Sequence, residues 1–212
     1  MSAPTVPGAS TDLSETEARI LRAALHVFSL KGRDGARMQA IADEAEINKA
    51  MLHYYFRSKN KLYEATFDHI VHKFFERTAA RLAAAASFDD ALRAFIDSYV
   101  ELGRKRPEVV RLLLIEHLSG GGTLAPRLRR LYDRPDTQTG HLLHRVEAAM
   151  RSGELRQGDP IQVVLTIVSC CMCFFVVLPT ATVFSPEIAE DLDGFIDARK
   201  AHLFETLRRG LT

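Results

Sequence analysis

Residues 38–61 read MQAIADEAEINKAMLHYYFRSKNK, a stretch that contains two short helical patterns separated by a turn. Its apolar residues recur at helical spacing in two short runs, residues 38–45 and residues 49–56. Glu46, Ile47 and Asn48 lie between the runs, and Asn48 can cap the second helix through its side-chain oxygen. Two short helices joined by such a turn have the layout of a helix-turn-helix.

The second helix of this pair is rich in basic and aromatic residues. In a helix-turn-helix the second helix enters the major groove of DNA, and its N-terminal residues contact base edges. Residues 47–61 contain no Asp or Glu and four cations, which are Lys49, Arg57, Lys59 and Lys61. This local charge suits contact with phosphates. By spacing alone, however, a basic amphipathic helix without a nucleic-acid partner fits the same residues, with Leu52 and Phe56 in a protein core.

The composition is that of an ordinary soluble globular protein, with 47% hydrophobic and 26% charged residues in 212. The formal net charge is only +1, so a signal for nucleic-acid binding can only be local. The first 13 residues predict a disordered arm and lack the features of a signal peptide. Three cysteines lie in one apolar run, which favours free thiols in the reducing cytoplasm over a disulfide framework.

Helical periodicity continues along most of the chain, and no sustained alternation typical of strands is present. We expect a first helix over residues 15–30, capped by Ser14 and ended by Gly32. Ser58 can cap a long helix over residues 59–86. Further helices are predicted over residues 88–105, from Pro107 to the glycines at 120–122, and over residues 124–151 with a break near Pro135. The predicted fold is all-α with about nine helices. It has a disordered arm (1–13), a three-helix head carrying the helix-turn-helix (14–58) and a larger helical domain (59–212).

Residues 161–178 form a nearly uninterrupted apolar run, about the length that spans a bilayer. No aromatic belt or cluster of positive charge flanks it, and Asp159-Pro160 is also a helix start in soluble proteins. We therefore expect a fully buried helix over residues 159–179 and no membrane association. A final helix over residues 186–207 is expected to pair with it as half of a four-helix dimer interface. The stripe predicted for that interface consists of Ile188, Leu192, Phe195, Ile196, Leu203 and Leu207.

The head resembles the DNA-binding head of the TetR family of bacterial regulators. The stretches that carry the resemblance are AALHVFSLKG (23–32), MQAIADEA (38–45) and AEINKAMLHYYFRSKNKLYEATF (45–67). The phrase GELRQGDP (153–160) is also similar to family members, whereas the rest of the chain matches only in its layout of helices. The resemblance implies a homodimer that binds double-stranded DNA at a palindromic operator, with a pocket for a small-molecule effector in the larger domain.

The resemblance also assigns roles to residues of the head. Gln39 matches a position that often reads bases, and its amide suits pairing with adenine. The positions that face the groove are Lys49, Ala50 and His53, and those that contact phosphate are Tyr54 and Lys59. Two residues depart from the family pattern. Arg37 stands where a capping threonine that also contacts phosphate is usual. Arginine can still contact phosphate as a cation, which keeps Arg37 among the expected DNA-binding residues, but it cannot accept the capping bond. Glu46 stands where a glycine is usual, which would be unfavourable in a left-handed backbone.

The larger domain is expected to hold the effector among its helices. Candidate wall residues are Phe67, Tyr99, Leu113, His117, Met172, Phe174 and Phe175, although each also fits a plain core position. His117 is the polar exception and could orient a ligand. The effector implied is small and largely apolar, and the sequence implies no cofactor. Its binding is expected to release a repressor from its operator.

Two other functions fit parts of the chain. Cys170, Cys171 and Cys173 suggest a redox-responsive regulator, but at about 100° per residue they do not share a helix face, which disfavours a common metal site. A redox sensor also needs an exposed thiol of low pKa, whereas this run is apolar. A helical enzyme is the other alternative. No phosphate-binding loop, nucleophile elbow or HExxH arrangement occurs in the sequence, so we expect no catalytic residues.

Overall fold

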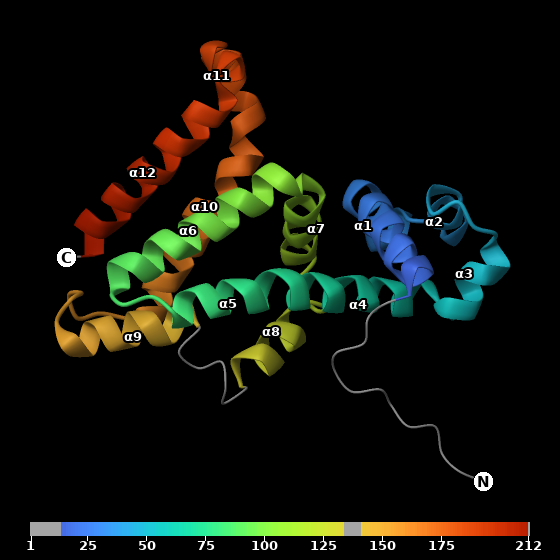
Figure 1. The fold of residues 1–212 in the computed structure, drawn as a ribbon, viewed down its shortest axis with the longest axis horizontal. Helices are drawn as coiled ribbons and strands as arrows, with labels where there is room; N and C mark the ends of the chain where they lie inside the picture. Colours follow the sequence, from blue (N-terminus) through green and yellow to red (C-terminus); the bar gives the residue numbers. More distant parts are fainter. Residues whose placement is uncertain (1–13, 134–140, 212) are drawn as a thin grey trace, which may run out of the picture. The chain divides into compact units, whose positions relative to one another are not determined.

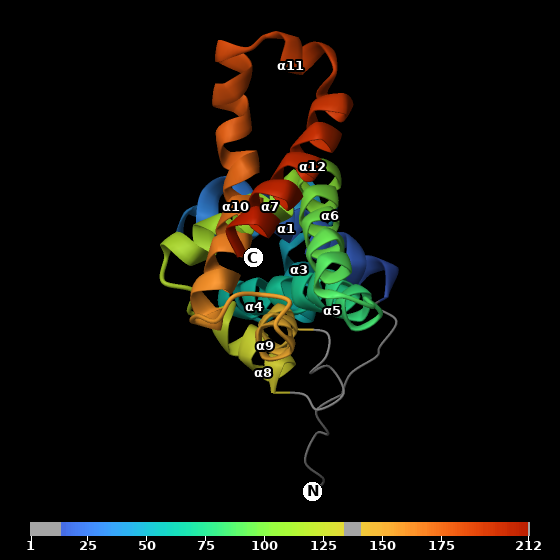
Figure 2. The same ribbon diagram turned by 90° about the vertical axis from the view of Figure 1, so that its left-hand side faces the viewer.

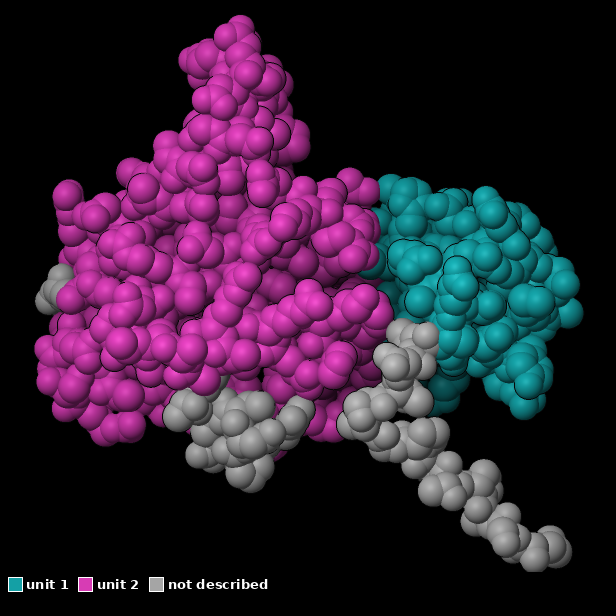
Figure 3. Space-filling model, in the orientation of Figure 1, with its two compact units in different colours: residues 1–66 teal, residues 67–212 magenta. Residues whose placement is uncertain are grey.

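The computed structural model describes residues 14–133 and 141–211. Within these residues the chain is helical and contains no strand, which confirms the predicted all-α class (Figure 1). The arm expected over residues 1–13 and the break expected near Pro135 lie outside the described residues. The chain divides into two compact units, Met1–Thr66 and Phe67–Thr212, which Figure 3 shows in separate colours.

Unit 1 contains the three helices of the head and the start of a fourth. They are α1 (Glu15–Gly35), α2 (Met38–Glu44), α3 (Lys49–Tyr55) and the first part of α4 (Lys59–Ile70). Ser14 caps α1 as predicted, because its Oγ accepts the Glu17 amide at 3.2 Å. Gly32 has a φ of 65°, which breaks the regular helix at the predicted position, and α1 continues beyond this kink to Gly35. The largest fully buried side chains of the unit are Ile20, Phe28, Ile41, Leu52 and Leu62.

The long helix expected over residues 59–86 is interrupted. It consists of α4, a π-helical turn η1 (Val71–Phe75) and α5 (Glu76–Ala83). A π-turn adds one residue to the helical repeat, so the side chains after it face in a different direction from those of an unbroken helix. No Gly or Pro occurs between residues 59 and 86, and the sequence therefore carries no local signal for this change.

Helix α6 (Phe88–Lys105) is the centre of unit 2. It packs against α5, α7 (Pro107–Leu118), α9 (Leu142–Ser152), α10 (Pro160–Phe184) and α12 (Leu192–Leu211). Gly103 permits the close approach of α10, because a Cβ at this position would lie 2.2 Å from the Phe175 ring. The remaining segments are α8 (Ala125–Tyr132) and the short α11 (Glu187–Glu190), which joins α10 to α12 at one end of both helices (Figures 1 and 2).

Helix α10 differs from its prediction in length and in burial. It continues through Pro179 to Phe184, and the break in regular helix comes only at Ser185. It is long and apolar enough to cross a membrane, but only 22% of its most apolar 18-residue window is buried within the chain. The expectation of a fully buried helix is therefore wrong for the single chain. The large exposed side chains on α10 are Ile161, Leu165, Val176, Val177, Val183 and Phe184.

The last predicted helix is divided into α11 and α12 at Asp191, whose carboxylate Oδ1 accepts the Gly194 amide at 2.9 Å. The apolar stripe predicted to face a partner subunit is also largely buried within the chain. Ile196, Leu203 and Leu207 are buried within the chain, where α12 packs on α6. Most of this stripe therefore belongs to the core of unit 2, while α10 carries the exposed apolar surface.

Candidate DNA interface and effector cavity

The turn between α2 and α3 has a defined backbone geometry. Asn48 caps α3 as predicted, with its side-chain oxygen 2.7 Å from the Met51 amide. The Ile47 amide donates to the Ala42 carbonyl at 3.0 Å and closes the turn. Glu46 has a φ of 53° and is the one non-glycine residue with positive φ in the described part of the chain. This strain, of about 1 kcal/mol, arises where a glycine is usual in the family pattern.

Helix α3 is held by one buried residue and presents most of its surface to solvent. Leu52 is fully buried, whereas Phe56 is only half-buried. The four α3 positions assigned to DNA, Lys49, Ala50, His53 and Tyr54, are all exposed. Tyr54 is 77% exposed and packs edge-to-face on Tyr55, with ring centroids 5.5 Å apart. This arrangement leaves an acid-free polar helix face available to a duplex.

The other three residues assigned to DNA have individual surroundings. The Lys59 ammonium donates to the carbonyls of Asp34 and Ala36, at 3.0 and 3.1 Å, and so holds the end of α1. The Gln39 side-chain nitrogen donates one hydrogen to Asp43 at 2.7 Å, which leaves its second N–H and its oxygen to pair with a base. Arg37 is exposed and makes no side-chain cap at the start of α2, in agreement with the chemistry of arginine.

Unit 2 contains a cavity of about 630 Å³, within the range of small-molecule sites. Its walls come from the end of η1 and from α5 to α10 and are mainly aliphatic and aromatic, with Thr78, Tyr99, His117, Arg129, Tyr132 and His141 as polar groups. Burial raises the pKa of Tyr99 well above its usual value, and burial likewise lowers the pKa of His141. Both side chains are therefore neutral near pH 7 and able to serve as hydrogen-bonding groups in an apolar site.

Four of the seven predicted wall residues line this cavity, namely Tyr99, Leu113, His117 and Met172. The other three do not. Phe67 is fully buried in unit 2, Phe174 packs against the Phe175 ring at 4.8 Å, and Phe175 covers Gly103 of α6. Sequence reasoning missed Thr78 of α5, Tyr132 of α8 and His141. Their place in the wall depends on how α5, α8 and α9 pack, and no local motif indicates it.

The cysteine cluster does not form a single site. Cys171 is buried, Cys170 is half-buried and Cys173 is exposed, as the helical spacing predicted for residues on different faces. Burial, with a smaller contribution from Cys170, raises the pKa of the Cys171 thiol to about 12. A reactive cysteine requires a lowered pKa, so Cys171 has the chemistry of a buried apolar residue.

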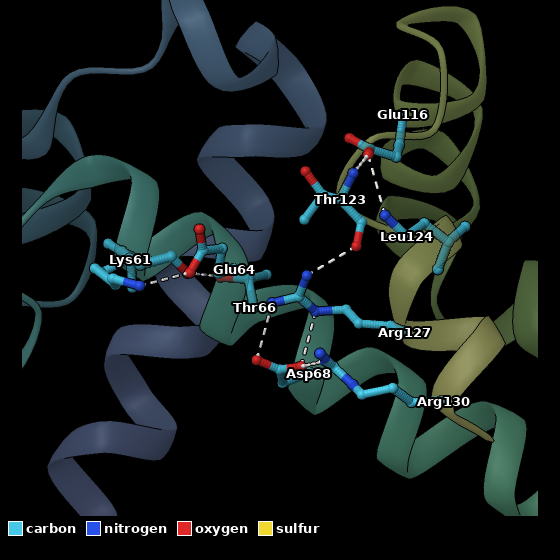
Figure 4. A network of polar contacts seen from close by, with 10 residues as sticks. Lys61, Glu64, Thr66, Asp68, Glu116, Thr123, Leu124, Arg127 and Arg130 are labelled. Carbon is cyan, nitrogen blue, oxygen red and sulfur yellow. Dashed lines mark hydrogen bonds and ion pairs between the residues drawn. The ribbon is translucent and has the colours of Figure 1, made fainter. Parts of the chain in front are cut away.

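A polar network connects α4, α7 and α8 within unit 2 (Figure 4). Arg127 donates to both carboxylate oxygens of Asp68, at 2.7 and 3.0 Å, and to the Thr123 carbonyl at 2.8 Å. The buried carboxylate of Glu116 accepts the amides of Thr123 and Leu124. The network therefore positions the start of α8, which supplies several residues of the cavity wall.

Comparison with known proteins agrees with this two-part organisation. The family profile described as "Bacterial regulatory proteins, tetR family" matches residues 20–66, and the profile "Tetracyclin repressor-like, C-terminal domain" matches residues 89–203. The chain is 32% identical to the HTH-type transcriptional repressor NicS of Pseudomonas putida over 157 residues, 74% of each protein. It is 32% identical to the HTH-type transcriptional regulator RutR of Escherichia coli over 168 residues, 74% of this chain and 73% of RutR.

The fold as a whole is also known. The crystal structure of SCO4942 from Streptomyces coelicolor aligns with a TM-score of 0.70 at 25% identity, covering 93% of this chain and 98% of the other. Both profiles fall on the parts that carry the exposed α3 face and the cavity. The chain belongs to the TetR family of bacterial transcriptional regulators.

Proposed function

We propose that this regulator is a cytoplasmic repressor that binds a palindromic operator as a homodimer and leaves it when a small, largely apolar effector occupies the 630 Å³ cavity. The observation that carries the proposal is the exposed, acid-free face of α3. Lys49 and His53 on this face suit base edges, and Tyr54 suits a phosphate.

The exposed side of α10 supports the homodimer. Val176, Val177, Val183 and Phe184 are at least half exposed in one chain, and a contiguous apolar surface of this kind marks an interaction site. A second copy related by a two-fold axis would present the same surface and cover it. A dimer also places two α3 helices on one duplex, as a palindromic site requires.

Sedimentation of the detergent-free protein tests the dimer. Val176→Glu together with Val177→Glu is expected to give a monomer, because both charges would be buried in the interface. Leu118→Glu is the matched control, since Leu118 is an apolar residue of α7 that is 88% exposed. A protein that needs detergent to remain in solution would indicate instead that α10 enters a membrane.

Selection of bound duplexes from a random DNA pool tests the operator. A palindrome with half-sites about one helical turn apart is expected, because two α3 helices would occupy successive major grooves. Lys49→Ala and His53→Ala should change the selected sequence, whereas Arg151→Ala on the exposed end of α9 should not. Failure to enrich any sequence over a range of salt concentrations would remove the support for a DNA-binding regulator.

A further inference from the structure

Unit 2 has another hollow, here called the basic groove, formed by the end of α4, η1, α5, α6 and the start of α7. Its volume is about 260 Å³. Five cations line it, which are Lys73, Arg77, Arg81, Lys105 and Arg106, against a single carboxylate, that of Glu101. The formal net charge of the whole chain is only +1, so this concentration of positive charge is a local feature.

Neighbouring acids neutralise only part of the basic groove. Arg106 pairs with Glu108, and Glu101 pairs with two further cations. Glu101 accepts from Lys105 at 2.6 Å and from Arg81 at 3.4 Å, and the hydrogen bond from Lys105 is the main reason that the pKa of Glu101 is lowered. Lys73 and Arg77 are exposed and have no carboxylate partner among residues 14–133 and 141–211. Because Lys73 and Arg77 line the same groove, their like charges repel each other, and a bound anion would offset the repulsion.

The basic groove and the apolar cavity share a wall. Thr78 lines both, and its hydroxyl donates to the Phe74 carbonyl at 2.9 Å. Phe74 lines the basic groove, and the next residue of η1, Phe75, lines the cavity. Phe74 also packs edge-to-face on Tyr99 of the cavity, with ring centroids 5.0 Å apart. The Thr78 side chain and the contact between Phe74 and Tyr99 therefore lie between the two hollows, and π-turns such as η1 are frequent at functional sites.

We propose that the effector is an amphipathic anion, whose apolar chain fills the cavity while its phosphate-ester head group binds in the basic groove to Lys73 and Arg77. Movement of the Phe74 and Thr78 side chains joins the two hollows when the ligand binds. The guanidinium of Arg77 matches two phosphate oxygens at once, and Lys73 adds a point charge. This inference rests on the proposed function, because it takes the cavity as the effector site.

Calorimetric titration of the full chain with decyl phosphate, 1-decanol and inorganic phosphate tests the inference. Decyl phosphate is expected to bind at least about tenfold more tightly than either 1-decanol or inorganic phosphate, because only it occupies both hollows. The variant Lys73→Gln with Arg77→Gln should lose that advantage and bind 1-decanol as the unchanged protein does. Arg151→Gln with Arg156→Gln removes two exposed charges elsewhere in unit 2 and should change nothing.

A second variant tests whether the alkyl chain of the ligand lies in the cavity. Leu128→Trp places a larger side chain in the cavity wall and should weaken both decyl phosphate and 1-decanol. Equal affinities for the two ligands, or an unchanged advantage of decyl phosphate in the Lys73→Gln, Arg77→Gln variant, would overturn the inference.

Operator binding separates this failure from that of the proposed function. If the selected operator is bound normally and the ligands behave as stated above, the basic groove belongs to the effector site. If the Lys73→Gln, Arg77→Gln variant loses operator affinity without any ligand, the groove contacts DNA phosphates and the inference is wrong, although the regulator remains. If no operator is found while decyl phosphate still binds as expected, the basic groove is still a head-group site, but the proposed function is wrong.

Discussion

Arg127 of α8 binds Asp68 of α4 through two parallel hydrogen bonds, Nε to Oδ1 at 2.7 Å and Nη2 to Oδ2 at 3.0 Å. The Arg127 side chain is 11% exposed and that of Asp68 is 55% exposed, so water screens the pair only in part. Since Arg127 also donates to the Thr123 carbonyl, one guanidinium holds the loop before α8 against α4 (Figure 4).

Removing the charge of Asp68 should therefore cost stability. We expect Asp68→Asn to lower the free energy of unfolding by about 1 kcal/mol, because a bidentate, partly buried pair is worth more than an exposed one. Glu205→Gln is the control, since the Glu205–Arg209 pair is exposed and 3.8 Å apart. It should change stability by less than about 0.5 kcal/mol. Urea denaturation followed by circular dichroism measures both, and equal effects would show that the Arg127 pair has no special role.

At Glu46, by contrast, a substitution should raise stability, because the backbone there is left-handed. Glu46→Gly should raise the stability of the head by about 0.5–1 kcal/mol, because glycine adopts a positive φ without steric cost. Glu44→Gly is the matched control, because Glu44 is a neighbouring exposed glutamate within α2. There glycine should destabilise by up to about 1 kcal/mol, since the position is helical. Thermal denaturation of the two variants compares them directly, and a loss of stability in both would contradict the strain at Glu46.

Substitution of Tyr54 should weaken DNA binding alone, whereas substitution of Lys59 should also lower stability. Tyr54→Phe keeps the exposed ring and deletes only the hydroxyl, so stability should stay within about 0.5 kcal/mol while affinity for all duplexes falls alike. Lys59→Ala removes the two hydrogen bonds to the end of α1 and should cost about 1–2 kcal/mol of stability as well. Fluorescence anisotropy with labelled operator at several salt concentrations, beside thermal denaturation, separates the two effects. An unchanged stability of Lys59→Ala would show that these bonds contribute nothing.

The buried Cys171 thiol makes stability depend on pH above neutrality. The pKa of this thiol is about 12 in the folded protein, against an ordinary value of 9.0. Between these values the unfolded chain loses the proton and the folded chain keeps it, so stability falls as pH rises. The contribution is about 1.4 kcal/mol per pH unit over the part of this range that can be measured.

The measurement compares the original protein with Cys171→Ala between pH 8 and pH 10.5 by urea denaturation. The variant should lose stability less steeply above pH 9, whereas Cys173→Ala, at an exposed position, should keep the original slope. The same variants test a redox role. Cys173 should react with a thiol reagent at pH 8 while Cys171 stays protected, and rapid modification of Cys171 would refute its burial.

Most of the local structure could be predicted from nearby residues. The caps formed by Ser14, Asn48 and Ser58 and the end of regular helix at Gly32 follow from residues within a few positions of one another. The all-α class and the exposed polar face of α3 follow in the same way, because helical periodicity decides which side chains share a face.

The helix faces that meet one another depend instead on packing between distant segments. Met172 lines the cavity while Phe174, two residues away, packs elsewhere, and Lys59 binds carbonyls of α1 that lie more than twenty positions earlier in the sequence. The π-turn at residues 71–75 and the exposure of α10 are further results of packing, and no nearby Gly or Pro marks the π-turn. Contacts between distant segments depend on the combined fit of several helices, which local spacing does not encode.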